Sequence, residues 1–264
     1  MKDLLLRTST GITLVILFTG SILLGPSTFL LMILLIYGLS IRELYKLFSI
    51  RRGIPGALAA GSGFLLIMAV YACLHLHLSP LWLILPAALW VIGYARPGYR
   101  QTASLSLFWL AIPLASFLSL GWFPDGIPYR SMFPLSVIIL VWIHDMFAYL
   151  TGSLLGKHPM TPRLSQGKTW EGFAGGMIFT LIAGWVLYRI TGAFTPVTWL
   201  FSALVISLLG LSGDLFESGM KRKMNVKDTG HLLPGHGGIL DRFDSLLFVA
   251  PALLLLLLFL NLFQ

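Results

Sequence analysis

The chain has 264 residues, of which 57% are hydrophobic and 11% are charged, and its net charge at pH 7 is +8. Soluble domains are about 45–50% apolar and about 25% charged, so a soluble two-domain enzyme of this composition would leave too many leucines facing water. The same excess excludes a nucleic-acid-binding module built on the positive charge. The composition therefore predicts an all-α, polytopic membrane helix bundle.

A transmembrane helix needs roughly 20 mostly apolar residues, and by this criterion the sequence contains about nine candidates. In chain order they are 11–25, 27–41, 56–78, 81–95, 103–121, 131–150, 172–191, 195–214 and 244–262. The first is interpreted as a retained helix, because no clear A-x-A-type cleavage site follows it. We expect a single integral-membrane domain over 1–264, with N-terminal spans in 1–100 and the active-site spans and loops in 101–264.

The basic residues predict the orientation of these helices. With the N-terminus in the cytosol, all 18 lysines and arginines except Arg130 and Arg189 fall in cytosolic segments. Short cytosolic loops of membrane proteins carry such an excess of Lys and Arg. The pattern predicts a cytosolic N-terminus and a C-terminus outside. The compact chain favours a bacterial inner (plasma) membrane.

Asp145 lies in the last third of span 131–150, where a carboxylate is expensive: insertion at the centre of a membrane helix costs about 2.5–3.5 kcal/mol. Such residues normally face a bundle interior or a water-filled cavity, and we expect the same here. The neighbouring His144 points about 100° away on a helix and is interpreted as structural.

The segment 214–221 carries polar residues at helical spacing. If the eighth span continues through it, Asp214, Glu217, Ser218 and Lys221 recur at intervals of three and four and share one face. A solvated helix end would show the same pattern.

The cytosolic segment 218–245 has the inventory of a phosphate site. It reads SGMKRKMNVKDTGHLLPGHGGILDRFDS, with cations, carboxylates and histidines around a Pro-Gly and a Gly-Gly pair. Glycines let backbone N–H groups approach phosphate oxygens, and Lys and Arg bind them. Carboxylates bind Mg²⁺, which bridges phosphates, and Asp241 and Asp244 would face one way if a helix begins there. The segment therefore predicts magnesium-dependent phosphoryl chemistry at the cytosolic face.

The polar loop 151–171 supports the same prediction. Ser165, Lys168, Thr169 and Glu171 come just before span 172–191, and a helix N-terminus favours phosphate. A Walker P-loop is excluded, because Pro162 stands where that motif needs a glycine.

Segment 218–245 resembles the signature of the integral-membrane phosphatidate cytidylyltransferases (CDP-diacylglycerol synthases). The matching residues are Ser218, Met220, Lys221, Arg222, Lys227, Asp228, Gly230, Leu233, Pro234, His236, Gly237, Gly238, Ile239, Asp241, Arg242, Phe243 and Asp244. Weaker marks of the family are Arg7 with Thr10-Gly11, and Lys168, Thr169, Glu171 and Gly172. One departure is visible: the family tends to have Ser-Pro before its Lys-Thr, whereas this chain has Ser165-Gln166-Gly167.

The resemblance implies that the phosphate of phosphatidic acid attacks the α-phosphorus of CTP, giving CDP-diacylglycerol and pyrophosphate. It also implies Mg²⁺, with a second cation in a two-metal centre on Asp214 and Asp241, and on Asp145. The catalytic residues would be Asp214, Asp241, Lys221, Lys227 and Asp228. The substrate-binding residues would be Ser165, Lys168, Thr169, Glu171, Ser218, Arg222, His236, Gly237, Gly238, Arg242 and Asp244.

Three alternatives stay open at this stage. Asp145 could be a relay of a polytopic transporter. The same chemistry could act on another lipid phosphate, since any lipid chain suits apolar residues. A structural scaffold is a third alternative, against which the number of charges at the membrane edge argues. The small residues at 56–63 could pair in a homodimer, but packing within one chain explains them equally well.

Overall fold

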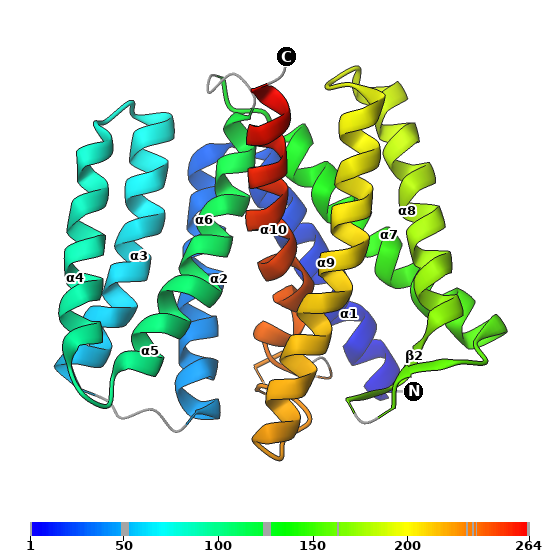
Figure 1. Cartoon of the computed structure of the whole chain (residues 1–264), viewed down its shortest axis with the longest axis horizontal. Helices are drawn as coiled ribbons and strands as arrows, with labels where there is room; N and C mark the ends of the chain where they lie inside the picture. The colour runs from blue at the N-terminus through cyan, green and yellow to red at the C-terminus, as the bar shows by residue number, and fades with distance from the viewer. Residues whose placement is uncertain are drawn as a thin grey trace. The chain divides into compact units, whose positions relative to one another are not determined.

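The structure is a computed structural model that describes residues 2–48, 53–123, 128–162, 164–230, 232–233, 235 and 237–262, without the side chains of 2–7 and 166. The described residues are mostly helical, as predicted (Figure 1). The chain forms two compact units: unit 1 comprises Met1–Ser131 and Asp228–Phe243, and unit 2 comprises Met132–Lys227 and Asp244–Gln264.

Seven of the described helical segments are long and apolar enough to cross a membrane. They are Pro26–Leu47, Ile54–His75, Arg100–Trp122, Met132–Leu155, Trp170–Thr191, Pro196–Lys223 and Leu240–Asn261. The two other predicted spans correspond to shorter apolar helices, Thr8–Leu23 and Pro80–Ala95. The chain is thus an integral membrane protein, whereas the count of nine spans stays a prediction.

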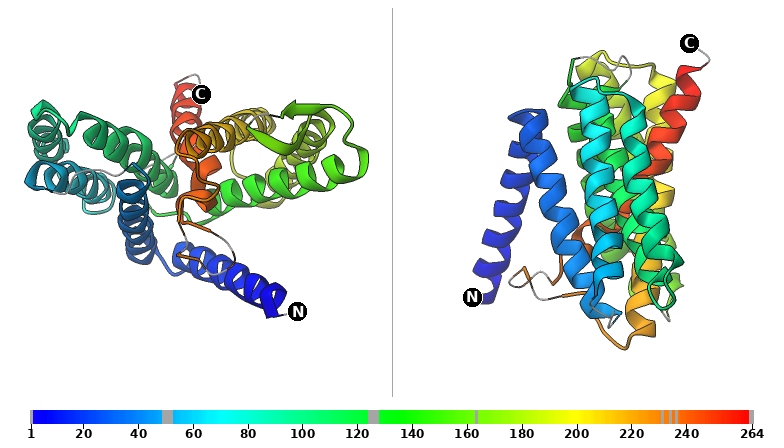
Figure 2. Two further views of the ribbon diagram at one scale, coloured as in Figure 1. Left: turned by 90° about the horizontal axis from the view of Figure 1, so that it is seen from below. Right: turned by 90° about the vertical axis from the view of Figure 1, so that its left-hand side faces the viewer.

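Unit 1 is built largely from hairpins of apolar helices. Its elements are α1 (Lys2–Leu23), α2 (Pro26–Leu47), α3 (Ile54–His75), η1 (Pro80–Leu83), α4 (Ile84–Ala95), α5 (Arg100–Ser104), the π-helical η2 (Leu105–Ala111), α6 (Ile112–Ser119) and η3 (Leu120–Trp122). Prolines in the first turns of α2 and α3 fit helix starts, where an N–H is unpaired anyway. Helices α3 and α4 lie side by side (Figures 1 and 2).

Much of the small-residue stretch 56–63 packs inside unit 1. Ala59, Ser62 and Gly63 are buried, and a Cβ added at Gly63 would come within 2.9 Å of the Cβ of Ala111. Small residues allow such close helix contacts in membranes. Packing within one chain therefore explains these three positions, while Gly61 has open space beside its Cα.

Unit 2 contains α7 (Met132–Leu155), β1 (Pro159–Thr161), β2 (Ser165–Thr169), α8 (Trp170–Thr191) and α9 (Pro196–Lys223). It also contains the part of α10 (Leu240–Asn261) that begins at Asp244. Glycines let α7 and α8 touch through their backbones. A Cβ at Gly172 would come within 2.7 Å of the Ala148 carbonyl oxygen, and one at Gly176 within 2.8 Å of that of His144. Such contacts hold membrane helices together where the hydrophobic effect cannot.

The polar loop 151–171 is more ordered than the sequence indicated. Helix α7 continues to Leu155, and β1 and β2 then pair antiparallel, with Thr161 opposite Ser165 and Pro159 opposite Thr169. Strands of three and five residues carry too little hydrophobic alternation for a period of two to be visible. The hairpin places Thr169 directly before α8.

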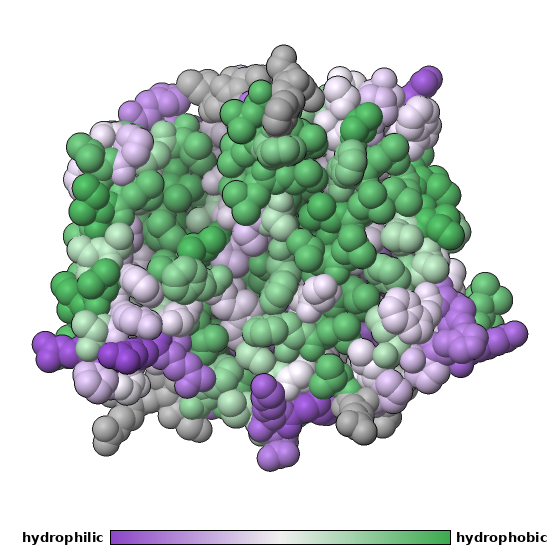
Figure 3. All heavy atoms as spheres, in the orientation of Figure 1, coloured by the Kyte–Doolittle hydropathy of each residue, from purple (hydrophilic) through white to green (hydrophobic). Residues whose placement is uncertain are grey.

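The flanks of the helices in both units are predominantly hydrophobic, and hydrophilic residues gather near helix ends (Figure 3). Large apolar side chains are exposed on many of the helices, among them Ile16 on α1, Leu35 on α2 and Ile182 on α8. A soluble monomer rarely exposes so much apolar surface, which indicates contact with lipid. In unit 1 the end of α2, the start of α3 and the end of α4 lie at the same end of the bundle (Figure 1).

Candidate active site

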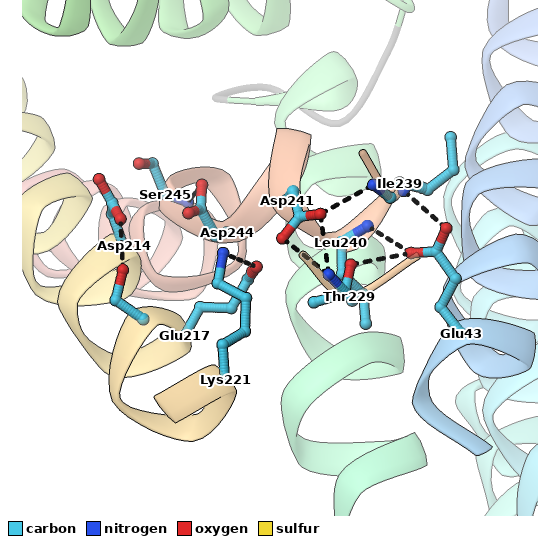
Figure 4. A network of polar contacts seen from close by, with 12 residues as sticks. Glu43, Asp214, Glu217, Lys221, Thr229, Ile239, Leu240, Asp241, Asp244 and Ser245 are labelled. Carbon is cyan, nitrogen blue, oxygen red and sulfur yellow. Dashed lines mark hydrogen bonds and ion pairs between the residues drawn. The ribbon is translucent and has the colours of Figure 1, made fainter. Parts of the chain in front are cut away.

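The residues predicted to form the site are found in both units, and Figure 4 shows some of them with the polar contacts of Glu43, Asp214, Glu217 and Asp241. We call the unit 1 set the loop anchor, which comprises Glu43, Thr229, Gly238, Ile239, Leu240 and Asp241. We call the unit 2 set the lysine-paired cluster, which comprises Lys168, Asp214, Glu217, Ser218 and Lys221. Each set is described within its own unit.

Glu43 is the central residue of the loop anchor. It lies in the last turns of α2, and only 5% of the residue is exposed. Its Oε1 accepts a hydrogen bond from the Ile239 N–H at 2.9 Å, and its Oε2 accepts one from the Leu240 N–H at 3.0 Å. The Thr229 hydroxyl donates to Oε2 at 3.2 Å (Figure 4). One carboxylate therefore binds both ends of the segment between Thr229 and Leu240.

Two glycines make room for the Glu43 carboxylate. A Cβ added at Gly230 would lie 2.7 Å from its Oε1, and one at Gly238 would overlap both its Oε2 and the Thr229 hydroxyl. The carboxylate also faces the beginning of α10, where unpaired N–H groups and the helix dipole favour negative charge. These contacts compensate the cost of burying a charge.

Asp241 holds the same segment from the first turn of α10. Its Oδ2 accepts hydrogen bonds from the Thr229 N–H at 3.0 Å and from the Gly238 N–H at 2.8 Å. Gly235 and Gly237 adopt φ angles of 74° and 83°, in the left-handed region that favours glycine. The start of α10 at Leu240 confirms the predicted helix, in which Asp241 and Asp244 are three residues apart.

The lysine-paired cluster confirms the predicted face of α9, because the helix continues to Lys223. The Ser218 hydroxyl donates to Asp214 Oδ1 at 3.3 Å, and Lys221 Nζ donates to Glu217 Oε1 at 3.0 Å. Glu217 is buried, with 1% of its side chain exposed. Lys168, at the end of β2, forms an ion pair with Asp214. The carboxylates here are thus neutralised by side-chain cations.

Asp244 lies beside this cluster, because α10 and α9 touch in unit 2. A Cβ at Gly213 would come within 2.6 Å of the Asp244 carbonyl oxygen. The Asp244 carboxylate is close enough to Asp214 and Asp145 to interact with them as like charges, and to Lys221 as an opposite charge. Three of the predicted acidic site residues therefore share one electrostatic environment in unit 2.

The sequence predicts that Asp145 faces the bundle interior or a water-filled cavity. With 58% of its side chain exposed, it is not buried in the interior, and the water-filled cavity stays a prediction. The interior position belongs to His144, which is 4% exposed and packs edge-on against Phe173 of α8. This burial agrees with a structural histidine. His144 and Asp145 are neighbours in the sequence but point about 100° apart on the helix. The hydrophobic pattern of α7 does not indicate which of the two directions faces the interior.

The start of α8 accounts for two predicted substrate-binding residues by local contacts. The Thr169 hydroxyl accepts the Gly172 N–H at 3.1 Å and caps the helix. Glu171 accepts the N–H groups of Lys157 and His158, each at 3.2 Å, and pairs with the His158 ring. Thr169 and Glu171 therefore fix the connection from α7 to α8.

The remaining predicted residues are mostly at the surface. Arg222, Lys227, Asp228 and Arg242 are exposed, and Ser165 and Gly237 are half-buried. His236 lies outside the described residues. Its predicted role in a glycine cradle therefore stays a prediction.

Comparison with known proteins places the whole chain in one family. The model of the cytidylyltransferase family matches residues 5–260. The chain belongs to this family. A phosphatidate cytidylyltransferase of Staphylococcus haemolyticus is 32% identical over 260 residues, covering 95% of this chain and 98% of that protein. Those of Staphylococcus saprophyticus and Staphylococcus aureus are 33% and 31% identical over the same shares.

The donor atoms of this cytidylyltransferase suit a magnesium ion. The carboxylates that share an environment in unit 2, and Asp241 in unit 1, offer the oxygen ligands that Mg²⁺ prefers. Within the described ranges, no three His, Cys, Asp or Glu side chains are grouped to hold a metal ion. The predicted Mg²⁺ therefore stays a prediction.

Sequence reasoning missed the role of Glu43 in the cytidylyltransferase. Its carboxylate contacts residues 196 and 197 positions later in the chain, which no local pattern relates to it. The sequence signal for Glu43 was the energetic cost of placing an acid in an apolar helix. An acid near the end of an apolar helix must reach water or find partners, and burial leaves only the second option.

Proposed function

We propose that this cytidylyltransferase transfers the cytidylyl group of CTP to phosphatidic acid. A phosphate oxygen of the lipid forms a bond to the α-phosphorus of CTP, and the bond from that phosphorus to the β-phosphate oxygen breaks. The products are CDP-diacylglycerol and pyrophosphate. The near full-length relationship to proteins named phosphatidate cytidylyltransferase carries this proposal.

The residues of the chain match the demands of this reaction. The nucleophile is already an anion, so no strong general base is required. The barrier is repulsion between phosphates, which fixed cations relieve. We assign Lys221, Arg222 and Lys227 to the phosphates of CTP or of the lipid, and the backbone N–H of Gly237 to a phosphate cradle. The Gly238 N–H, which the sequence also predicts for this cradle, donates to Asp241 instead.

We assign Mg²⁺, and a second cation, to Asp214 and Asp241, with Asp145 as a further ligand. A bound divalent ion neutralises phosphate charge and holds attacking and leaving oxygens in line. The chain contributes the carboxylates, and Lys168 neutralises Asp214 in the structure. Lys168 is thereby placed beside the proposed metal ligand, where its charge could also serve a phosphate.

The membrane arrangement is part of the proposal. The basic ends of α2 and α9 carry Lys46 and Lys221 to Lys223, which favours a cytosolic position for these ends. The site would then meet CTP from the cytosol and phosphatidic acid from the bilayer of a bacterial inner membrane. The open side of Gly61 on α3 is the surface through which we expect any homodimer to form.

The test is turnover by purified protein in detergent with labelled CTP, phosphatidic acid and Mg²⁺. Asp241→Asn is the informative variant, because Oδ2 alone accepts the closer bonds from Thr229 and Gly238, and an amide oxygen can replace it. The variant should keep the loop and lose the charge. We expect a loss of about 100- to 1000-fold, as when one preorganised electrostatic group is removed. Arg189→Gln, in the last turn of α8, is the control.

Pyrophosphate release that requires phosphatidic acid, and that falls in Asp241→Asn alone, supports the reaction and the site. Release with a polyprenyl phosphate but none with phosphatidic acid keeps the chemistry and changes the substrate. No release with either lipid from folded protein contradicts the proposed function.

A further inference from the structure

We infer that Glu43 is a positioning residue of this enzyme, which fixes the signature loop 229–240 and the first turn of α10 by bonds to both ends of the loop. The inference rests on the proposed function for its activity readouts. It also makes a claim about the loop itself that can be measured without substrate.

The contacts of Glu43 hold the two ends of the loop together. Thr229 begins the loop and Ile239 and Leu240 end it, and all three donate to the one carboxylate. Asp241 adds a second connection, between Thr229 and Gly238. Because a charged acceptor forms stronger hydrogen bonds than a neutral one, both acids hold backbone that would otherwise be a glycine-rich segment with high conformational entropy.

Glu43 does not need to touch substrate to act. Both of its oxygens are occupied by the loop, and the residue is 5% exposed. Asp241, the proposed metal ligand, directly follows its partner Leu240, and Gly237, which we assign to the phosphate cradle, lies two residues before its partner Ile239. A displacement of these groups by about 1 Å can cost 100-fold in rate, because the reacting groups must be held in line.

The decisive variant is Glu43→Gln, which keeps the size of the side chain. Glutamine has one acceptor oxygen, whereas Glu43 uses both oxygens for N–H groups. The amide would therefore place its own N–H₂ against a backbone N–H. Asp241→Asn has a smaller conflict, since Oδ2 accepts both closer bonds and Oδ1 accepts only a longer one, from the Thr229 N–H at 3.3 Å. Tyr45→Phe is the matched control on the same helix, because it removes one hydrogen bond, to the Gly56 carbonyl oxygen, and leaves the loop untouched.

The first measurement is hydrogen exchange of the folded protein in detergent, without substrate. In Glu43→Gln we expect the amides of Ile239 and Leu240 to exchange at least about tenfold faster than in the parent chain, because local opening exposes them. The amides of α3 should not change. In Tyr45→Phe and in Asp241→Asn the exchange of residues 239 and 240 should stay as in the parent chain.

The second measurement is turnover as a function of Mg²⁺ and CTP. We expect Glu43→Gln to lower kcat by about 10- to 100-fold and to raise the half-saturating Mg²⁺ concentration. A merely structural role would lower the folded fraction, and with it kcat, without moving half-saturation. Tyr45→Phe should keep both values.

Thr229 supplies a second test if Glu43→Gln fails to fold. Thr229→Val removes the hydroxyl that donates to Glu43 but keeps the shape of the side chain, whereas Thr229→Ser keeps the hydroxyl. We expect a loss of about two- to tenfold in kcat for valine, the size of one lost hydrogen bond, and rescue by serine.

The outcomes separate the two proposals. An inactive parent chain contradicts the proposed function, while exchange at residues 239 and 240 still decides whether Glu43 anchors the loop. Unchanged exchange in Glu43→Gln overturns the inference. Faster exchange with unchanged kcat and half-saturating Mg²⁺ also overturns it, because the anchored loop would then not position the site. Equal activity of Thr229→Val and Thr229→Ser counts against it in the same way.

Discussion

The loop anchor and the lysine-paired cluster solve the same problem in different ways. Each contains carboxylates near the end of an apolar helix, where an unpaired charge is costly. In the loop anchor, Glu43 and Asp241 are satisfied by backbone N–H groups. In the lysine-paired cluster, Asp214 and Glu217 are satisfied by lysines.

The two kinds of partner give the carboxylates different roles. A carboxylate bound by backbone N–H groups fixes the conformation of the chain, whereas one bound by a lysine can exchange that partner. A backbone N–H cannot leave without unfolding the loop, so the carboxylate that accepts it determines the conformation of the chain. A lysine is a flexible point charge that can move from a carboxylate to a phosphate. We therefore expect conservative changes in the two sets to act differently on stability, on loop order and on turnover.

The largest effect is expected at the Lys221–Glu217 pair, where the effect of charge on stability can be separated from its effect on turnover. Lys221→Met leaves the buried Glu217 carboxylate without its lysine, which costs about 3–5 kcal/mol for a buried pair. Glu217→Gln added to Lys221→Met should recover the melting temperature but not the activity, if Lys221 binds phosphate. Thermal melting and turnover of the two variants test this. Recovery of both would mean that Lys221 is only structural.

A smaller effect is expected from crowding of the loop anchor. Gly230→Ala would place a Cβ 2.7 Å from Glu43 Oε1, whereas Gly38→Ala, on the same helix as Glu43, meets no atom within 4 Å. We expect Gly230→Ala to lower kcat about tenfold, through displacement of the reacting groups, with Gly38→Ala unchanged. Equal activity of the two alanine variants would show that the loop tolerates movement of Glu43, and would weaken the contrast between the loop anchor and the lysine-paired cluster.

The smallest effect is expected at Glu171, which belongs to neither set. Its partners in the structure are the exposed residues Lys157 and His158, and exposed ion pairs contribute about 0.2–1 kcal/mol. Glu171→Gln should therefore change turnover by less than about threefold. A loss near 100-fold would restore the role in substrate binding that the sequence predicts for it.

Sequence patterns predicted those parts of the site that lie within one helix. Helical spacing placed Asp214, Ser218 and Lys221 on one face of α9, and Asp241 in the first turn of a helix. Thr169 marked the start of α8. In each case the relevant neighbours are three or four residues apart, which a period of 3.6 residues reveals.

What depended on distant contacts could not be predicted in this way. The partners of Glu43, the ion pair between Lys168 and Asp214 and the β1–β2 hairpin are set by tertiary packing or by very short strands. For Asp145 and His144, an apolar helix surrounded by lipid and protein shows no clear polar face, so the sequence did not indicate which of the two is buried.

The separation of Glu43 from its partners has a consequence for biogenesis. When a ribosome completes α2, the amides that will bind this carboxylate have not been made, and they follow 196 and 197 residues later. At about 5–20 residues per second, this delay is about 10–40 s. During that interval the acid must stay in contact with water, so α2 is expected to settle at its final depth only when the last helix is inserted.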